Sequence, residues 1–132
     1  MDLEILNIAS DTDNIRNVKN HTHFSKVKNS LCGDEVLIKL IIKDENIVDF
    51  GYQGSSCVYC QASASLLSKI AINNKKNNLN KLCDDAESYF DGNLEIIEKK
   101  WKFLKKLFKK KNISRKECIL LPFKTLKKIV SG

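Results

Sequence analysis

The middle of the chain alternates apolar and polar residues with the two-residue period of a β-strand. One face of residues 36–43 carries a row of aliphatic side chains, Val36, Ile38, Leu40 and Ile42. An Asp-Glu-Asn turn follows at residues 44–46, and residues 47–53 return with a second alternating pattern. The pattern predicts a β-hairpin, and the alternation of residues 24–28 predicts a third antiparallel strand.

Outside this hairpin, apolar residues recur every three or four positions, as they do on one face of a helix. This spacing predicts polar loops at residues 10–20 and 73–80 and helices over residues 3–9, 57–72, 79–90, 94–108 and 119–130. Pro122 falls in the last helix, and proline is tolerated in a first helical turn because its missing amide has no intrahelical partner there. We therefore expect this helix to start just after Cys118.

These elements indicate an α+β protein. One face of the three-stranded antiparallel sheet must be covered, and we expect about four to five helices to pack on that face. A chain of 132 residues is long enough for one core but not for two. We expect a single domain over residues 1–132, with an N-terminal helix and loop at residues 1–20 and the core at residues 21–132.

Composition narrows the cellular setting. Hydrophobic residues make 42% of the chain, and no run of 18 apolar residues exists, so we expect no membrane partner. The first residues lack the basic start and apolar run of a signal peptide, which predicts a cytoplasmic protein. In a reducing compartment, five cysteines argue for metal or sulfur chemistry more than for disulfides.

Three cysteines lie at expected junctions between elements, far apart in the sequence. Cys32 opens the tripeptide Cys32-Gly33-Asp34, and Cys57 and Cys118 lie close to helix starts, where the helix dipole favours a thiolate. Thiolates bind zinc and iron–sulfur clusters, and a carboxylate such as that of Asp34 can supply a fourth ligand. Folding that joins these four side chains would make a metal or cluster site.

The other donor side chains point less clearly to chemistry. Cys60 forms a CxxC spacing with Cys57, which zinc sites and redox dithiols both use, and no second CxxC accompanies it. Cys83 falls on the apolar stripe of an expected helix and fits core packing. His21 and His23 share one side of an expected strand, where a metal site or a plain surface pair would both fit.

The net charge of +7 is unevenly distributed. Residues 1–98 carry 10 basic and 15 acidic side chains, whereas residues 99–132 carry 13 basic side chains and one acidic one, Glu117. A solvated lysine face, a partner-docking patch and a nucleic-acid surface are all open readings. Nucleic acid ranks last, because 21 of the 23 basic residues are lysine and only two arginines could read guanine bidentately.

Three segments of the chain together resemble the cysteine motifs of a known family. Residues 29–34 read Asn-Ser-Leu-Cys-Gly-Asp, residues 54–57 read Gly-Ser-Ser-Cys, and residues 115–118 read Arg-Lys-Glu-Cys. They look like the motifs of iron–sulfur cluster assembly scaffolds, namely the IscU and SufU proteins and the N-terminal domain of NifU. IscU-type proteins have a histidine where this chain has Glu117, and the 61-residue separation of Cys57 and Cys118 looks more like the SufU branch.

The resemblance implies a function and a ligand set. By resemblance, Cys32, Asp34, Cys57 and Cys118 hold zinc or iron or a transient [2Fe–2S] cluster, with Cys60 and Arg115 as possible auxiliary residues. A cysteine desulfurase would deliver persulfide sulfur to Cys32, and acceptor apo-proteins or cluster carriers would receive the cargo. Such a protein is a carrier or scaffold for iron–sulfur cluster assembly rather than an enzyme.

Three alternatives stay open from the sequence. The first is a zinc-dependent sulfur-transfer partner that activates the desulfurase without building clusters. The second, from a different class, is a lysine-rich module that binds nucleic acid or an acidic protein. The third is an oxidoreductase that uses the Cys57–Cys60 pair.

Overall fold

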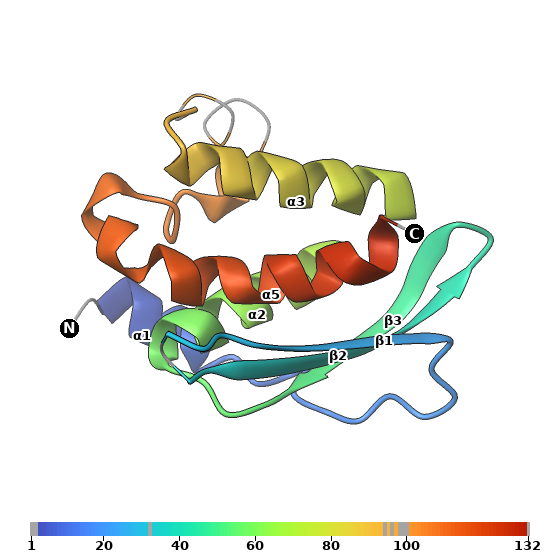
Figure 1. The fold of residues 1–132 in the computed structure, drawn as a ribbon. Helices are drawn as coiled ribbons and strands as arrows, with labels where there is room; N and C mark the ends of the chain where they lie inside the picture. The colour runs from blue at the N-terminus through green and yellow to red at the C-terminus, as the bar shows by residue number, and fades with distance from the viewer. Residues whose placement is uncertain (1–2, 32, 94, 96, 98–100, 132) are drawn as a thin grey trace.

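The computed structural model describes residues 3–31, 33–93, 95, 97 and 101–131 (Figure 1). In chain order, its helices and strands are α1 (Leu3–Ala9), β1 (His23–Lys28), β2 (Glu35–Lys43), β3 (Asn46–Gln53), α2 (Val58–Ala71), α3 (Lys76–Phe90), the 3₁₀ helices η1 (Lys102–Leu104) and η2 (Lys110–Arg115), and α5 (Lys116–Val130).

The three strands form one antiparallel sheet in the order β1-β2-β3, as predicted. Asp44 and Glu45 join β2 to β3, and both adopt positive φ angles of 52° and 65°. Two successive positive φ angles match the twist of a two-residue hairpin turn. The alternating burial of β2 places its aliphatic row against the helices, which confirms the strand period read from the sequence.

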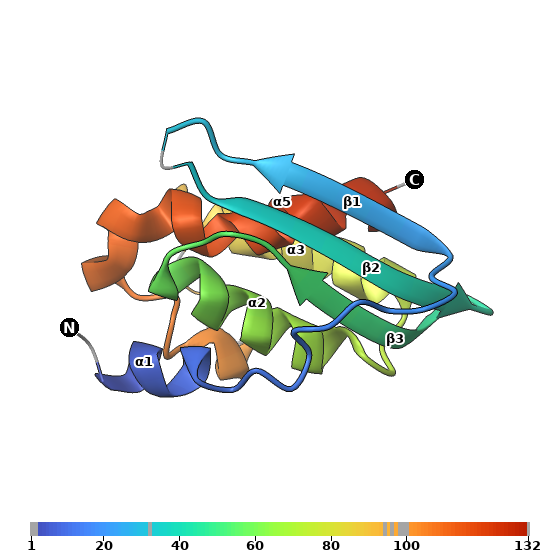
Figure 2. The ribbon, with the colours of Figure 1, turned by 90° about the horizontal axis from the view of Figure 1, so that it is seen from below.

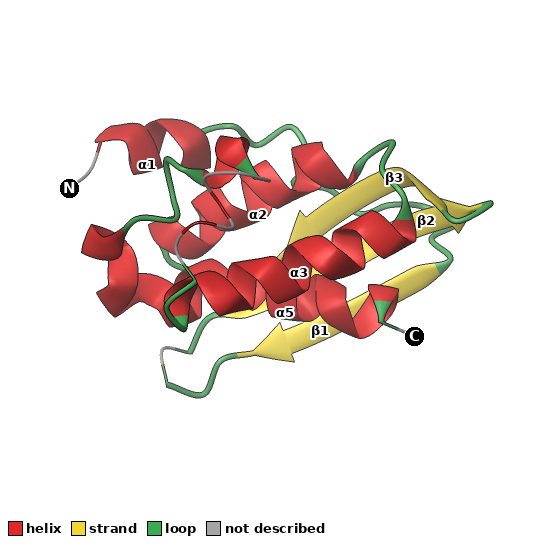
Figure 3. Cartoon of the chain, turned by 90° about the horizontal axis from the view of Figure 1, so that it is seen from above, coloured by secondary structure: helices red, strands yellow, loops and turns green. Residues whose placement is uncertain are grey.

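The helices cover one face of this sheet, which confirms the expected α+β class (Figures 2 and 3). α5 lies at the centre of the helical layer and contacts β1, β2, α2 and α3. Its side chains and those of α2 and the sheet form one hydrophobic core, and the largest fully buried side chains are Phe50, Phe123, Ile5, Ile38, Leu40, Ile47, Leu67, Leu79, Leu82, Ile97, Leu104 and Leu107. None of the described helices is long and apolar enough to cross a membrane.

The segment between α1 and β1 runs along β3 on the side away from β2. The backbone amide of Tyr52 donates to the carbonyl oxygen of Asn14 at 3.0 Å, and Arg16 pairs with Asp49 through its two terminal guanidinium nitrogens. A Cβ atom on Gly51 would lie 2.5 Å from the Arg16 carbonyl oxygen, so only glycine allows this close approach. The segment covers the edge of the sheet that would otherwise be open.

Three predicted boundaries are wrong. α3 begins at Lys76 rather than near residue 79, because its first turn is polar and faces solvent before Leu79 reaches the core. Residues 95 and 97 are helical as expected, and residues 94, 96 and 98–100 lie outside the described ones. From Trp101 onward, 3₁₀ turns replace the expected helix over residues 94–108. Leu104, Leu107 and Phe108 are still buried, so the apolar spacing marked core positions without marking a helix.

The last helix also starts earlier than expected. α5 begins at Lys116, two residues before Cys118, and Pro122 is therefore its seventh residue. Proline there removes one helical hydrogen bond, but its ring is buried in the core and the tertiary packing of α5 outweighs the loss. Cys118 nevertheless stays in the first turn, close to the helix N-terminus as predicted.

Candidate metal site

The loop from β1 to β2 brings Asp34 to the start of β2. The Asn29 amide donates to the Asp34 carbonyl oxygen and the Gly33 amide donates to the Asn29 carbonyl oxygen, both at 2.8 Å. Gly33 has a φ of +77°, a left-handed conformation that glycine adopts without strain. These bonds fix Asp34 in a closed turn, and its side chain is only 8% exposed.

Gly54 brings the next segment across the same end of β2. A Cβ atom on Gly54 would lie 2.0 Å from the Glu35 carbonyl oxygen, closer than any side chain can approach backbone. One residue later, the Ser55 carbonyl oxygen accepts a hydrogen bond of 2.8 Å from the Glu35 amide. The crossing therefore depends on glycine at position 54, and it places the start of α2 beside Asp34.

Cys57 is the N-cap residue of α2, with extended φ and ψ angles of −73° and 168°. Its backbone amide donates to Asp34 Oδ1 at 3.2 Å. Serine hydroxyls before a helix often cap its N-terminus, but no side-chain cap bond forms at the start of α2. The carboxylate of Asp34 occupies that place instead.

Cys118 reaches the same place from the third element, α5. It lies in the first turn of α5 and is 5% exposed. Next to it, the Ser63 hydroxyl of α2 donates to the Ile119 carbonyl oxygen at 2.5 Å, and both groups are buried. This bond fixes the start of α5 against α2 and so fixes Cys118 relative to Cys57.

The side-chain donor atoms of Asp34, Cys57 and Cys118 all lie within 4.8 Å of one another. No other group of three such donors occurs among the described residues. Asp34 Oδ2 is buried without a hydrogen-bond partner among the described residues, although a buried carboxylate oxygen normally has one. Two sulfur donors and an unsatisfied oxygen fit a zinc or iron ion, which binds both kinds of ligand at tetrahedral sites.

Cys32, the expected sulfur acceptor, lies outside the described residues. The sequence alone ties it to the site, because it precedes Asp34 by two residues. Three of the four expected ligands are thus brought together, and the place of the fourth stays a prediction.

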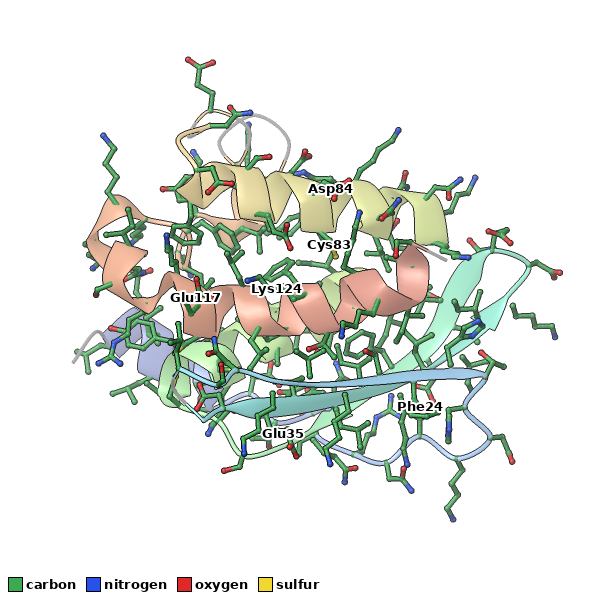
Figure 4. The ribbon with its side chains drawn as sticks, in the orientation of Figure 1. Phe24, Glu35, Cys83, Asp84, Glu117 and Lys124 are labelled. Carbon is green, nitrogen blue, oxygen red and sulfur yellow. The ribbon has the colours of Figure 1, made fainter. Side chains whose placement is uncertain are left out.

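The two remaining cysteines lie in the core. Cys60 is fully buried and does not belong to the donor group, so it does not share the open position of Cys57 one turn earlier. Cys83 lies on α3 where it faces α5, and burial raises the pKa of its thiol to about 12 (Figure 4). Cys83 is 1% exposed within the hydrophobic core, as expected for a packing role, and its thiol is protonated at neutral pH.

Arg115 and the two histidines complete the list of predicted side chains. The Arg115 guanidinium lies over the Tyr59 ring, 5.3 Å from its centroid, and this contact connects the end of η2 to the first turn of α2. His21 and His23 are exposed, and neither joins a group of three metal-donor side chains among the described residues.

Sequence reasoning missed the two residues that position the site. Gly54 enters the sequence analysis only as part of the Gly-Ser-Ser-Cys motif, although a glycine between a strand and a cysteine could have indicated a close backbone crossing. Ser63 carried no signal at all, because a serine in a helix is usually exposed and its partner is 56 residues away.

Comparison with known proteins agrees with the geometry. The family described as the NifU-like N terminal domain matches residues 4–89. An iron–sulfur cluster assembly scaffold protein IscU of Thermotoga maritima is 35% identical over 101 residues, which are 76% of this chain and 70% of that protein. An uncharacterized protein of Borreliella burgdorferi is 27% identical over 124 residues, 94% of this chain and 84% of that protein.

A solved structure shares the fold. It is a proposed iron–sulfur cluster assembly scaffold protein for the SUF system (FiSufU) from Fervidobacterium islandicum AW-1, with a TM-score of 0.86. Its sequence is 24% identical, and the match covers 96% of this chain and 93% of that chain. The family match, the IscU relative and the convergence of Asp34, Cys57 and Cys118 lead to one conclusion: the chain belongs to the NifU-like N-terminal family of iron–sulfur cluster scaffolds.

Proposed function

We propose that this protein accepts sulfur from a cysteine desulfurase and holds a metal ion or a transient [2Fe–2S] cluster on Cys32, Asp34, Cys57 and Cys118. The observation that carries the proposal is the convergence of Asp34, Cys57 and Cys118 from three separate elements. The buried, unsatisfied Asp34 Oδ2 supports it, because a metal ligand would satisfy that atom. Family membership supports the kind of cargo.

Each ligand type has a definite task in this proposal. Thiolates bind zinc and iron tightly, whereas a carboxylate oxygen is a harder and more exchangeable ligand. A carrier has to release its cargo, so one weaker ligand is useful. Asp34 takes this role through Oδ2, while its other oxygen, Oδ1, accepts the hydrogen bond from the Cys57 amide at the N-terminus of α2.

Sulfur transfer to Cys32 requires no outside oxidant or reductant. The Cys32 thiolate attacks the terminal sulfur of the desulfurase persulfide, and a new S–S bond forms at Cys32. The original S–S bond breaks, and its electron pair leaves with the desulfurase sulfur as a thiolate that takes up a proton. The chain ends as a persulfide and the desulfurase as a thiol, so this chain is a carrier.

The SufU-like branch fits this chain better than the IscU-like one. Glu117 stands directly before Cys118, Arg115 lies three residues before it, and 61 positions separate Cys57 from Cys118. This branch leaves two cargoes in competition, a bound zinc ion with sulfur transfer or an assembled cluster passed to acceptor apo-proteins. Both functions suit a reducing cytoplasm, where we place the protein.

Metal analysis tests the shared part of the proposal. Purified wild type should contain about one zinc or iron ion per chain, and Cys118→Ser and Cys32→Ser should each lose most of it. Cys83→Ser is the matched control, since Cys83 is as deeply buried as Cys118 but lies outside the donor group, and it should keep its metal. Unchanged metal in both ligand variants would sink the proposal.

Anaerobic reconstitution separates the two cargoes. Wild type is incubated with iron, cysteine and a cysteine desulfurase, and its absorption spectrum and iron content are compared with those of a zinc-loaded sample. Cluster absorption that disappears in Cys57→Ser supports the scaffold. Persulfide on Cys32 without cluster absorption, found by mass measurement, supports the zinc-bound sulfur acceptor.

A further inference from the structure

One end of the molecule carries exposed basic side chains, which we call the basic end: Lys102, Lys105, Lys106, Lys110, Lys111 and Arg115. They belong to η1, η2 and the turn between them, the orange segment that lies beside α1 and the start of α5 (Figure 1). Residues 99–116 contain no acidic residue. This stretch of the chain therefore carries only positive charge.

Four of these six side chains form no ion pair among the residues that the structure describes. Lys109, half-buried beside the basic end, pairs with Glu4 of α1 at 3.7 Å. Lys102, Lys105, Lys106 and Lys110 form no ion pair with any residue that the structure describes. Lysines held close together repel one another, which destabilises the compact state. Such a region fits a partner of opposite charge.

The basic end is held in place by its own core residues. Leu104, Leu107 and Phe108 are at most 3% exposed, and the Asn112 side-chain amide donates to the Leu107 carbonyl oxygen at 2.8 Å. Between the lysines, Phe103 is 43% and Ile113 55% exposed. Exposed apolar side chains on a fixed surface can form the centre of a protein interface, and the lysines around them can form its polar rim.

The basic end adjoins the candidate metal site. Arg115 is three residues before Cys118, and its guanidinium lies over Tyr59, two residues after Cys57. A protein docked on the basic end is therefore brought to the edge of the site. Nucleic acid would gain nothing from that position, and the basic end has only one arginine for base recognition.

We infer that the basic end is the docking surface for the cysteine desulfurase, and that it binds an acidic face around the desulfurase's persulfide-carrying cysteine. The inference rests on the proposed function, because it assigns a partner to the same site. The lysines steer the encounter, and Phe103 and Ile113 make the apolar contacts.

The test uses two variants with the same charge change. Lys105, Lys106 and Lys110 are replaced by glutamate in the first, and Lys19, Lys43 and Lys75 in the control. All six lysines are exposed, and Lys43 and Lys75 flank the β2–β3 turn at the opposite end of β2 from Asp34. Binding to the cysteine desulfurase of the same organism is measured by titration calorimetry at roughly 50 and 200 mM NaCl.

We expect the Kd of the first variant for the desulfurase to rise at least tenfold and to reach about the same value at both salt concentrations. The Kd of the control variant should change less than about threefold. Equal weakening of both variants, or none in either, would overturn the docking surface. Metal content measured on the same samples keeps the two proposals apart: full metal with unchanged binding refutes the basic end alone, and wild type without metal refutes the proposed function. A roughly 20-base-pair DNA duplex is the third probe, and tighter binding to DNA than to the desulfurase would overturn the inference as well.

Discussion

Gly54→Ala is the substitution that separates the backbone crossing at the site from ordinary glycine strain. The added Cβ would lie 2.0 Å from the Glu35 carbonyl oxygen, and real Cβ atoms essentially never come within 3.0 Å of such an atom. The backbone at position 54 or at the start of β2 must therefore move by about 1 Å. The φ of Gly54 is +147°, which alanine also adopts only under strain.

The magnitude follows from what this movement breaks. The Glu35–Ser55 hydrogen bond is worth about 1 kcal/mol, and the bond from the Cys57 amide to the Asp34 carboxylate about 2 kcal/mol. The positive φ adds about 1–2 kcal/mol of strain. We expect Gly54→Ala to lower the free energy of unfolding by about 4 kcal/mol and to weaken metal binding, because Cys57 and Asp34 are displaced from each other.

Urea unfolding followed by circular dichroism measures the stability, and competition with a chelator measures metal affinity. Gly92→Ala is the matched control, since Gly92 has a φ of +112° and no described heavy atom lies within 4 Å of the Cβ it would gain. It should lose about 1–2 kcal/mol from strain alone and keep its metal affinity. A Gly54→Ala protein within about 1 kcal/mol of Gly92→Ala, with unchanged metal affinity, would refute the reasoning.

Three further predictions concern charge and burial. The Arg16 guanidinium holds the pKa of Asp49 below its usual 3.8, so the pair stabilises the fold above that pH and is lost as pH falls through the lower folded value. Asp49→Asn should therefore flatten the acid side of the stability curve by up to about 1 kcal/mol, and an unchanged curve would contradict this. Cys83, buried and with a pKa of about 12, should be alkylated by iodoacetamide at pH near 8 more slowly than the half-buried Cys57 in metal-free protein, as peptide masses would show. Tyr59→Leu should cost under about 1 kcal/mol by removing the Arg115 contact, and a larger loss in urea unfolding would point to another role for the ring.

The parts of the fold that depend on local pattern could be predicted from the sequence. Apolar and polar residues alternate along β2, because one face of the strand meets the helices and the other does not. The turn residues that follow it predicted the hairpin. The helix predicted for residues 101–108 was wrong because tertiary contacts, not the local pattern, decide the conformation there. Its apolar residues are spaced for a helix, but they are buried by 3₁₀ turns that tertiary contacts impose.

The site was predictable by residue type but not by geometry. Cysteine spacing and one aspartate indicated which side chains to join, and Asp34, Cys57 and Cys118 do lie together. What joins them is the crossing at Gly54 and the bond from Ser63 to α5, both long-range contacts. The start of α5 was predicted too late because of Pro122. Tertiary packing of the helix outweighs the one hydrogen bond lost at this proline, and a single sequence does not show that packing.

The metal-donor side chains are far apart in the sequence, and this separation links metal release to unfolding. An ion held by Asp34, Cys57 and Cys118 closes loops of 23 and 61 residues. Closing such loops in an unfolded chain is entropically costly, so the unfolded state gathers these donors poorly and competes weakly for the ion. The bound ion then stabilises the native state by an amount that grows with the ratio of the free ion concentration to its Kd. Release of zinc to a colorimetric chelator should therefore become faster when the native state opens, and it would follow unfolding without an attached dye.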